Sequence, residues 1–172
     1  MIKVFGALLI ITGCMGMAAS RNAYWKQQYL ELKELVECIR ILDGQIRFCL
    51  TPLPQLLKEI EQKRGSNLGA VFGKIGREIE KQEGEMLQDI WERVLEAEKE
   101  GFSLAKEDLE LFGALGKGLG YLDVEMQKRH LESNLSELSA RIPEREKRYK
   151  EREKVIRSFG FAAAALLLLI LI

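Results

Sequence analysis

The sequence predicts an all-α protein, an antiparallel helical bundle of about six helices flanked by an N-terminal and a C-terminal transmembrane helix. The chain is 30% charged and 47% hydrophobic and has only three prolines, a composition typical of helices. Apolar residues recur at helical spacing, no stretch alternates like a strand, and both ends are strongly apolar. We therefore expect a transmembrane helix at 1–19, a helical bundle domain at 20–157 and a transmembrane helix at 158–172.

The overall composition excludes some classes of function. The formal net charge is zero, so no basic field favours nucleic acid as a partner. The three cysteines, Cys14, Cys38 and Cys49, are odd in number, which argues against a closed disulfide framework. On one straight helix Cys38 and Cys49 would lie about 16 Å apart, too far for the ~7 Å that a disulfide allows.

The N-terminal residues 4–19 contain no charged side chain and follow a single lysine, Lys3. An uncleaved transmembrane anchor is the interpretation we favour, although the run is slightly short for one. A cleaved secretory signal is an alternative. A third is a lipoprotein signal, because Ile11-Thr12-Gly13-Cys14 resembles a bacterial lipobox whose cysteine is lipidated and becomes the new N-terminus.

The next segment, residues 29–50, has apolar residues at alternating spacings of three and four, which predicts a helix with a heptad seam. The seam consists of Leu32, Leu35, Ile39, Leu42, Ile46 and Cys49. It passes through Asp43-Gly44 without a shift, so we predict one helix with a weak point there. No breaker separates this helix from the N-terminal run, so the two can be continuous.

The motif Thr51-Pro52-Leu53-Pro54 is the clearest boundary in the chain. A residue before proline is biased away from helical angles, so the previous helix should end here. Thr51 is expected to cap the next helix, with Pro52 in its first position. That helix should end near Arg64, at Gly65-Ser66-Asn67.

Three further helices are predicted from apolar residues spaced by three and four. They are expected to end near Gly84, at Glu100-Gly101 and near Leu119, and Ser103 is expected to cap the third. Their apolar residues predict a bundle core. These residues are Leu68, Val71, Phe72, Ile75 and Ile79, then Met86, Leu87, Ile90, Trp91, Val94 and Leu95, and then Leu104, Leu109, Phe112, Leu115 and Leu119.

The glycine-rich stretch GALGKGLGYLD invites comparison with a phosphate-binding loop around Lys117. It fails, because Leu111 and Gly118 occupy the positions that require glycine and serine or threonine. We interpret the glycines as structural, allowing helices to approach closely, with Gly120 ending a helix in the left-handed conformation. Asp123 should then cap the final helix.

The final helix is predicted to begin near Val124, with Leu131, Leu135, Leu138 and Ile142 continuing a heptad seam. Pro143 should kink or briefly break it. Beyond Pro143, opposite charges lie four residues apart, which favours a solvated helix. These expected pairs are Glu144–Arg148, Glu146–Lys150 and Glu153–Arg157.

The C-terminal residues 159–172 contain no polar side chain. As a helix they would span only about 21 Å, less than the ~30 Å hydrocarbon core of a bilayer. We therefore expect this segment to thin the bilayer locally or to pack with other helices. The nearest candidate is the N-terminal run, whose glycines favour close contact in lipid.

Positive charge sets the expected orientation in the membrane. Arg21 and Lys26 follow the first apolar run, and eight arginines or lysines lie between residues 141 and 157, before the second. Because positive residues flanking membrane segments stay on the cytoplasmic side, residues 20–157 are predicted to be cytoplasmic.

No constellation of residues points to catalysis, a cofactor or a metal, so we predict a protein that is not an enzyme and assign no catalytic, cofactor-binding or metal residue. The single histidine, His130, is best interpreted as a surface or interhelical residue. The cysteines lack the spacing of a zinc site, and no Glu-x-x-His motif suggests a metal site in a helical bundle.

Four features together resemble the stage III sporulation protein AB family of endospore-forming bacteria. The first is the short N-terminal anchor, and the second is Thr51-Pro52-Leu53-Pro54 after a helix ending in Gln45-Ile46-Arg47-Phe48. The third is Leu119-Gly120-Tyr121-Leu122-Asp123 followed by Gln127. The fourth is Arg157-Ser158-Phe159-Gly160 leading into the apolar end.

The resemblance implies a membrane protein of the mother cell, located at the outer forespore membrane. It implies similarity to the cytoplasmic domain of inner-membrane platform proteins of type II secretion and type IV pilus systems. The function implied is a non-enzymatic scaffold in a sporulation-specific secretion-like complex. Its partners would be the lipid bilayer and other subunits of the same operon, including a secretion-type ATPase, with no nucleic acid and no small-molecule substrate. The alternative is an extracytoplasmic lipoprotein or signal-bearing helical protein processed near Cys14.

Overall fold

The computed structural model describes the backbone of residues 2–48, 51–81, 84–121 and 123–171, with the side chains of most residues between 20 and 160. Within these residues the chain is all-α and has no strand, which confirms the all-α part of the predicted fold class. The elements are α1 (Ile2–Phe48), α2 (Leu53–Arg64), α3 (Asn67–Lys81), α4 (Leu87–Glu98), the short 3₁₀ helix η1 (Lys99–Gly101), α5 (Lys106–Tyr121) and α6 (Val124–Leu171).

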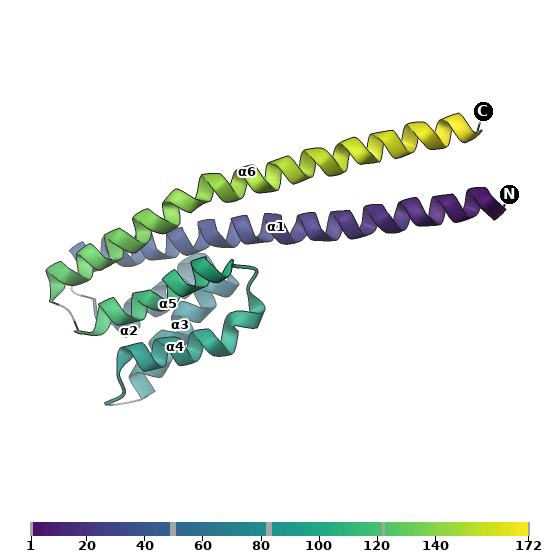
Figure 1. The fold of residues 1–172 in the computed structure, drawn as a ribbon. Helices are drawn as coiled ribbons and strands as arrows, with labels where there is room; N and C mark the ends of the chain where they lie inside the picture. The colour runs from purple at the N-terminus through teal and green to yellow at the C-terminus, as the bar shows by residue number, and fades with distance from the viewer. Residues whose placement is uncertain (1, 49–50, 82–83, 122, 172) are drawn as a thin grey trace.

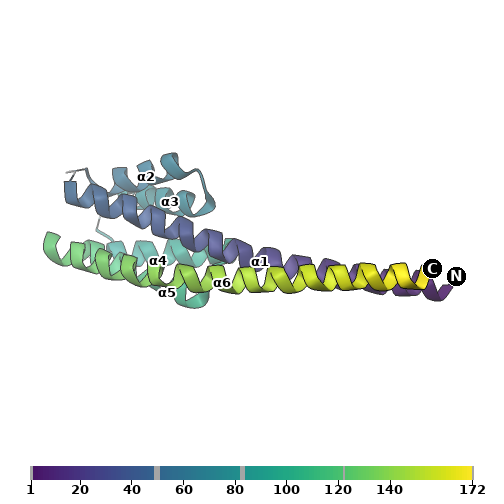
Figure 2. The same cartoon turned by 90° about the horizontal axis from the view of Figure 1, so that it is seen from above.

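Two long helices, α1 and α6, form an antiparallel pair that organises the molecule (Figure 1). Helices α2–α5, which we call the head, pack against the half of this pair that is farther from the chain ends. The rest of the pair extends away from the head. The two termini lie together at its far end, and this holds in the view from above (Figure 2).

The two predicted transmembrane segments, 1–19 and 158–172, form the far ends of α1 and α6. Most of their side chains lie outside the described residues. Among the residues that the structure does describe, no helix combines the length and the apolar character needed to cross a membrane.

The heptad seams explain why α1 and α6 pair. Leu32, Leu35, Ile39 and Leu42 of α1 are fully buried, as are Leu131 and Leu138 of α6. Leu135 and Ile142 pack against the same core, so the predicted seam on α6 is confirmed. Cys49, the last member of the seam predicted on α1, lies outside the described residues. As predicted, α1 continues through Asp43-Gly44 without a break. It is also one helix with the N-terminal run, a continuity that the sequence had left open.

An aromatic cluster forms the centre of the head. The rings of Phe72 on α3, Trp91 on α4 and Phe112 on α5 lie with centroids 5.1–5.9 Å apart. All three side chains are fully buried. The indole N–H of Trp91 donates a hydrogen bond to the carbonyl oxygen of Phe112 at 3.0 Å, so its one polar group is satisfied. This cluster joins three helices in one core.

The glycines of α5 allow close packing, as the sequence predicted. A Cβ atom on Gly116 would lie 2.6 Å from the Cβ of Trp91, and one on Gly118 would lie 2.5 Å from the ring of His130. The expected role of Gly120 is wrong, because Gly120 lies inside α5, and among the described residues only Gly65 and Gly84 have positive φ. Gly120 instead packs against Leu87 on α4, 3.2 Å from the position of its missing Cβ.

Two of the predicted helix boundaries are confirmed. Gly65 ends α2 in the left-handed conformation, with φ of 57°. Asp123 caps α6, since its Oδ1 accepts a hydrogen bond from the backbone N–H of Met126 at 2.9 Å.

Two of the predicted caps are wrong. Helix α2 begins one residue later than expected. Pro52 therefore occupies the N-cap position that was predicted for Thr51, and no side chain caps the helix. Helix α5 begins at Lys106, three residues beyond Ser103. The backbone N–H of Ser103 instead donates to the carboxylate of Glu31 on α1 at 2.6 Å, a tertiary contact that local sequence does not reveal.

Pro143 does not break α6. The helix is continuous from Val124 to Leu171 with Pro143 inside it, and its axis curves along its length in Figure 1. A proline removes one backbone hydrogen bond and disturbs the preceding turn, costing ~3 kcal/mol in an isolated helix. Here Leu138 and Ile142 pack against the core before the proline, and Arg145 pairs with the buried Asp108 of α5 just after it, so α6 is held on both sides of the site.

Candidate functional site

The residues that most invite a chemical interpretation occupy structural positions. Among the described side chains, no group of three or more His, Cys, Asp or Glu residues is placed to hold a metal ion. His130 is half-buried on α6, its Nδ1 lies 2.7 Å from the amide nitrogen of Asn134, and its ring packs over Gly118 of α5. It is therefore an interhelical residue, one of the two positions predicted for it.

Lys117 and Cys38 also have plain environments. Lys117 is exposed on α5, and its amine lies 3.9 Å from a carboxylate oxygen of Glu92 on α4. Cys38 is a free, fully buried thiol in α1. Burial, with the nearby Glu34 carboxylate, raises the pKa of Cys38 to about 12, so the thiol stays protonated at neutral pH. The side chains of Cys14 and Cys49 lie outside the described residues.

The candidate site is therefore the helical pair and its connections to the head. The first connection joins α5 to α6 through Asp108, which is fully buried. One carboxylate oxygen of Asp108 lies 3.3 Å from a guanidinium nitrogen of Arg141, and the other lies 3.2 Å from a guanidinium nitrogen of Arg145. Burial raises the pKa of Asp108, and the two arginines act in the opposite direction. A buried charge with two partners fixes the position of one helix against the other.

The second connection joins α1 to the head. Glu31 accepts the backbone N–H of Ser103 and, at 2.9 Å, the side-chain amide of Gln27. Three residues further along α1, Glu34 accepts the Nε of Arg64 at 2.8 Å and the hydroxyl of Ser66 at 2.9 Å. The hydrogen bond from Arg64 holds the pKa of Glu34 below its ordinary value. Helix α1 is thus fastened to α2, to the turn before α3 and to the segment before α5.

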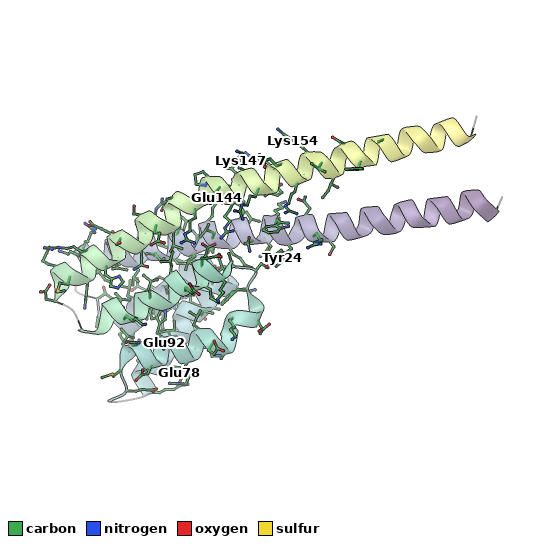
Figure 3. The ribbon with its side chains drawn as sticks, in the orientation of Figure 1. Tyr24, Glu78, Glu92, Glu144, Lys147 and Lys154 are labelled. Carbon is green, nitrogen blue, oxygen red and sulfur yellow. The ribbon has the colours of Figure 1, made fainter. Side chains whose placement is uncertain are left out.

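The third feature lies where the pair leaves the head, at residues 21–29 of α1 and 149–156 of α6, which we call the junction. In Figure 3, Tyr24 and Lys154 mark the junction on the two helices. The rings of Tyr29 and Tyr149 stack across the pair with centroids 6.2 Å apart. The guanidinium of Arg152 lies over the ring of Trp25 at 4.6 Å. An aromatic stack and a cation–π contact therefore join the two helices at the junction.

The charged segment of α6 behaves largely as predicted. Glu144 pairs with Arg148 at 2.6 Å and Glu146 pairs with Lys150 at 2.5 Å, both along the same helix. The third predicted pair involves Arg157, whose side chain lies outside the described residues. These pairs are exposed, so they support the helix and contribute little to tertiary stability.

Sequence patterns gave no signal for the residues that connect the helices. Asp108, Glu31 and Glu34 lie in ordinary charged stretches, and only the fold turns them inward. The same is true of Trp25 and Arg152, which are separated by most of the chain. The arrangement is a pair of long helices with the head on one half and the apolar runs 4–19 and 159–172 at the other. Such a device suits binding and assembly.

The comparisons with known proteins agree with one another. The family model described as stage III sporulation protein AB matches residues 3–172. The protein named Stage III sporulation protein AB from Bacillus subtilis (strain 168) is 25% identical over 171 residues, covering 99% of each chain. A solved structure of a protein of the same name superposes with a TM-score of 0.66 at 21% identity, covering 72% of this chain and 96% of that one. This structural likeness supports the all-α fold.

Proposed function

Since this chain belongs to the stage III sporulation protein AB family, a family of sporulation proteins, we propose that it is a non-enzymatic membrane scaffold subunit of a sporulation-specific secretion-like complex. In this proposal it resembles a secretion platform protein and acts at the outer forespore membrane, on the mother-cell side. Its partners are other subunits of the same sporulation operon, including a secretion-type ATPase.

One observation supports the membrane part of the proposal above the others. The antiparallel pairing of α1 and α6 places both chain ends at the same end of the molecule (Figures 1 and 2). The apolar runs 4–19 and 159–172 form those ends, and the sequence before and after the head is rich in arginine and lysine. Two apolar helix ends on one side of a charged domain suit insertion into one bilayer, with the head in the cytoplasm.

The scaffold part rests on the shape of the connections. The head is attached to both long helices, through Asp108 to α6 and through Glu31 and Glu34 to α1. A partner that binds the head is thereby held at a fixed position relative to the membrane segments. The described residues offer a rigid support for such a partner, in keeping with a role in assembly.

Cysteine accessibility in intact sporulating cells tests the topology. Cys14 and Cys49 are replaced by serine, and Cys38 stays because its buried thiol should not react. A cysteine is then introduced at Lys147, which is exposed on α6. We expect an impermeant maleimide to label it only after the cells are opened. Labelling from outside would overturn the cytoplasmic placement.

Affinity capture tests the partners. Full-length protein, tagged and solubilised from sporulating cells, should recover a secretion-type ATPase or a neighbouring membrane subunit of the operon. A capture that recovers neither would contradict the scaffold proposal. The intact mass of the same preparation tests the alternative, since loss of the residues before Cys14 together with a diacyl modification would mean a processed lipoprotein.

A further inference from the structure

A cleft of about 470 Å³ opens between α1 and α6 at the junction. From α1 it is lined by Arg21, Asn22 and Trp25, and from α6 by Glu151, Arg152 and Val155. Both walls come from the two long helices. The cleft therefore lies beyond the head, next to the places where the apolar runs begin.

The cations of this cleft differ from most others in the protein. Neither Arg21 nor Arg152 forms an ion pair with a described residue, whereas arginines 40, 47, 64, 77, 141, 145 and 148 all do. Arg152 only lies over the ring of Trp25. The one carboxylate in the lining, Glu151, is 3.8 Å from the amine of Lys147. The cleft therefore holds two arginines whose hydrogen-bond donors are free for an anion.

An unsatisfied acceptor lies beside these donors. The Oδ1 atom of Asn22 is buried, and within the described part of the chain it accepts no hydrogen bond. An acceptor left without a partner away from water is costly, so a ligand that brings a donor to this position gains from it. On the opposite wall Val155 is 54% exposed, an apolar surface in the same cleft.

We propose that this cleft binds the headgroup of an anionic phospholipid, with the phosphate between Arg21 and Arg152 and a headgroup hydroxyl donating to Asn22 Oδ1. The inference rests on the proposed membrane function, which places the junction at the bilayer surface. There Trp25 occupies the interfacial level that tryptophan favours, and Val155 faces the beginning of the acyl chains. A phosphodiester with a glycerol headgroup matches all three groups, because it supplies one negative charge, several acceptors and hydroxyl donors.

Lipid-selective quenching of Trp25 tests the proposal in the full-length protein. The protein is reconstituted in phosphatidylcholine vesicles containing a fixed fraction of phosphatidylglycerol, and either lipid is supplied in brominated form. The other tryptophan, Trp91, is buried in the head, so bromine in the bilayer should quench Trp25 alone. We expect phosphatidylglycerol to be preferred about fivefold over phosphatidylcholine at Trp25.

Matched variants separate the cleft from general surface charge. Replacing both cleft arginines (R21Q with R152Q) should abolish the preference. Replacing two arginines of the same helices outside the cleft, Arg40 and Arg148 (R40Q with R148Q), should preserve it. Asn22→Ala keeps all charges and should lower the preference about threefold, by loss of one hydrogen bond. Equal quenching by both lipids, or a preference that survives R21Q with R152Q, would overturn the headgroup site.

Two arms of the experiment keep the proposals apart. Vesicle flotation is measured first: protein that does not float contradicts the membrane function itself, whereas protein that floats but quenches equally with both lipids contradicts only the headgroup site. Free glycerol 3-phosphate is then added as a soluble competitor. We expect millimolar competitor to leave the preference unchanged, and its complete loss would mean that the cleft takes a soluble phosphate instead of a lipid.

Discussion

The two tryptophans of this chain occupy opposite environments, one in the head and one at the junction. Trp91 is fully buried between Phe72 and Phe112, and its N–H is satisfied by a backbone carbonyl. Trp25 is half-buried at the edge of an open cleft and lies beneath the guanidinium of Arg152. The same residue type therefore holds three helices together in one place and lines an open surface in the other.

The difference extends to the charged residues of the two regions. In the head and its connections, buried or partly buried charges are paired, as with Asp108 and its two arginines or Glu34 and Arg64. At the junction, Arg21, Arg152 and the Oδ1 of Asn22 have no such partner among the described residues. We therefore expect stability to depend on the paired charges of the head, and the proposed binding to depend on these two arginines and Asn22. Substitutions in the two regions should therefore have different consequences.

The largest effect should come from the tryptophans themselves. Trp91→Ala removes the centre of the aromatic cluster and should lower the free energy of unfolding by about 3–5 kcal/mol. Trp25→Ala should lower it by only about 1 kcal/mol, since that side chain is partly exposed. Chemical denaturation of the full-length protein in detergent, followed by helical circular dichroism, measures both. Equal losses would mean that the junction is as much a part of the core as the head.

A second test compares two glycines of one helix. A methyl group at Gly116 would lie 2.6 Å from the Cβ of Trp91, so Gly116→Ala should destabilise the head by about 1–3 kcal/mol. At Gly113 the nearest atom lies at 3.6 Å, an ordinary contact. Gly113→Ala should therefore stabilise the protein by up to about 1 kcal/mol, the helix propensity of alanine over glycine. The same denaturation experiment checks the two signs, and a stable Gly116→Ala variant would show that α4 and α5 can separate.

A third test uses pH on the connection between Glu34 and Arg64. The pKa of Glu34 is lower in the folded protein than its ordinary 4.5. Its contribution to stability is therefore present above that ordinary value and is lost as pH falls through the folded pKa. Because the pair is partly exposed, Glu34→Gln should cost about 1 kcal/mol at pH 7 and progressively less below pH ~4. Thermal unfolding between pH 7 and pH 3 measures it.

The control for that test is Glu110→Gln, at an exposed position 3.9 Å from Lys106. It should leave the profile of melting temperature against pH close to that of the unmodified protein. If the profile for Glu34→Gln matched that of the unmodified protein at every pH, the ion pair between Glu34 and Arg64 would not contribute to holding α1 against the head.

The smallest effect on folding is expected at the cleft. Replacing Arg21 and Arg152 by glutamine breaks no ion pair among the described residues and removes only the exposed contact of Arg152 with the Trp25 ring, so the free energy of unfolding should change by less than about 1 kcal/mol. The lipid preference at Trp25 should nevertheless disappear. A loss of several kcal/mol on denaturation would assign these arginines to the fold and erase the distinction between the two regions.

The helices were more predictable than their caps and interruptions. Residues such as Leu35 and Leu138 belong to long heptad seams. A seam can be recognised in the sequence because every turn repeats the same apolar spacing. Caps depend on single residues and compete with tertiary contacts. Ser103 illustrates this, since its backbone N–H finds Glu31 on a distant helix and the next helix begins later. Pro143 shows the same competition, because core packing before it and the Arg145–Asp108 ion pair after it keep one helix where local chemistry predicts an interruption.

The candidate site was less predictable than the fold. The sequence indicated that charge surrounds the apolar ends, and the structure places Arg21 of one helix near Arg152 of the other in a single cleft. That proximity depends on the antiparallel alignment of two helices separated by the whole head. No local pattern encodes the alignment. It follows from the summed packing of the two seams and from the pairing of Arg47 with Glu132 at the distal end of the pair.

The uninterrupted course of α1 and α6 has a mechanical consequence. A domain on one membrane helix is free to spin about that helix and to tilt over a flexible link. Two stiff helices, each continuous from the head to its own terminus and joined to each other across the junction, remove most of that rotational freedom. In the proposed setting, the head would present one constant face along the membrane plane. Each subunit would then already have the orientation that it needs to assemble into a ring or a lattice.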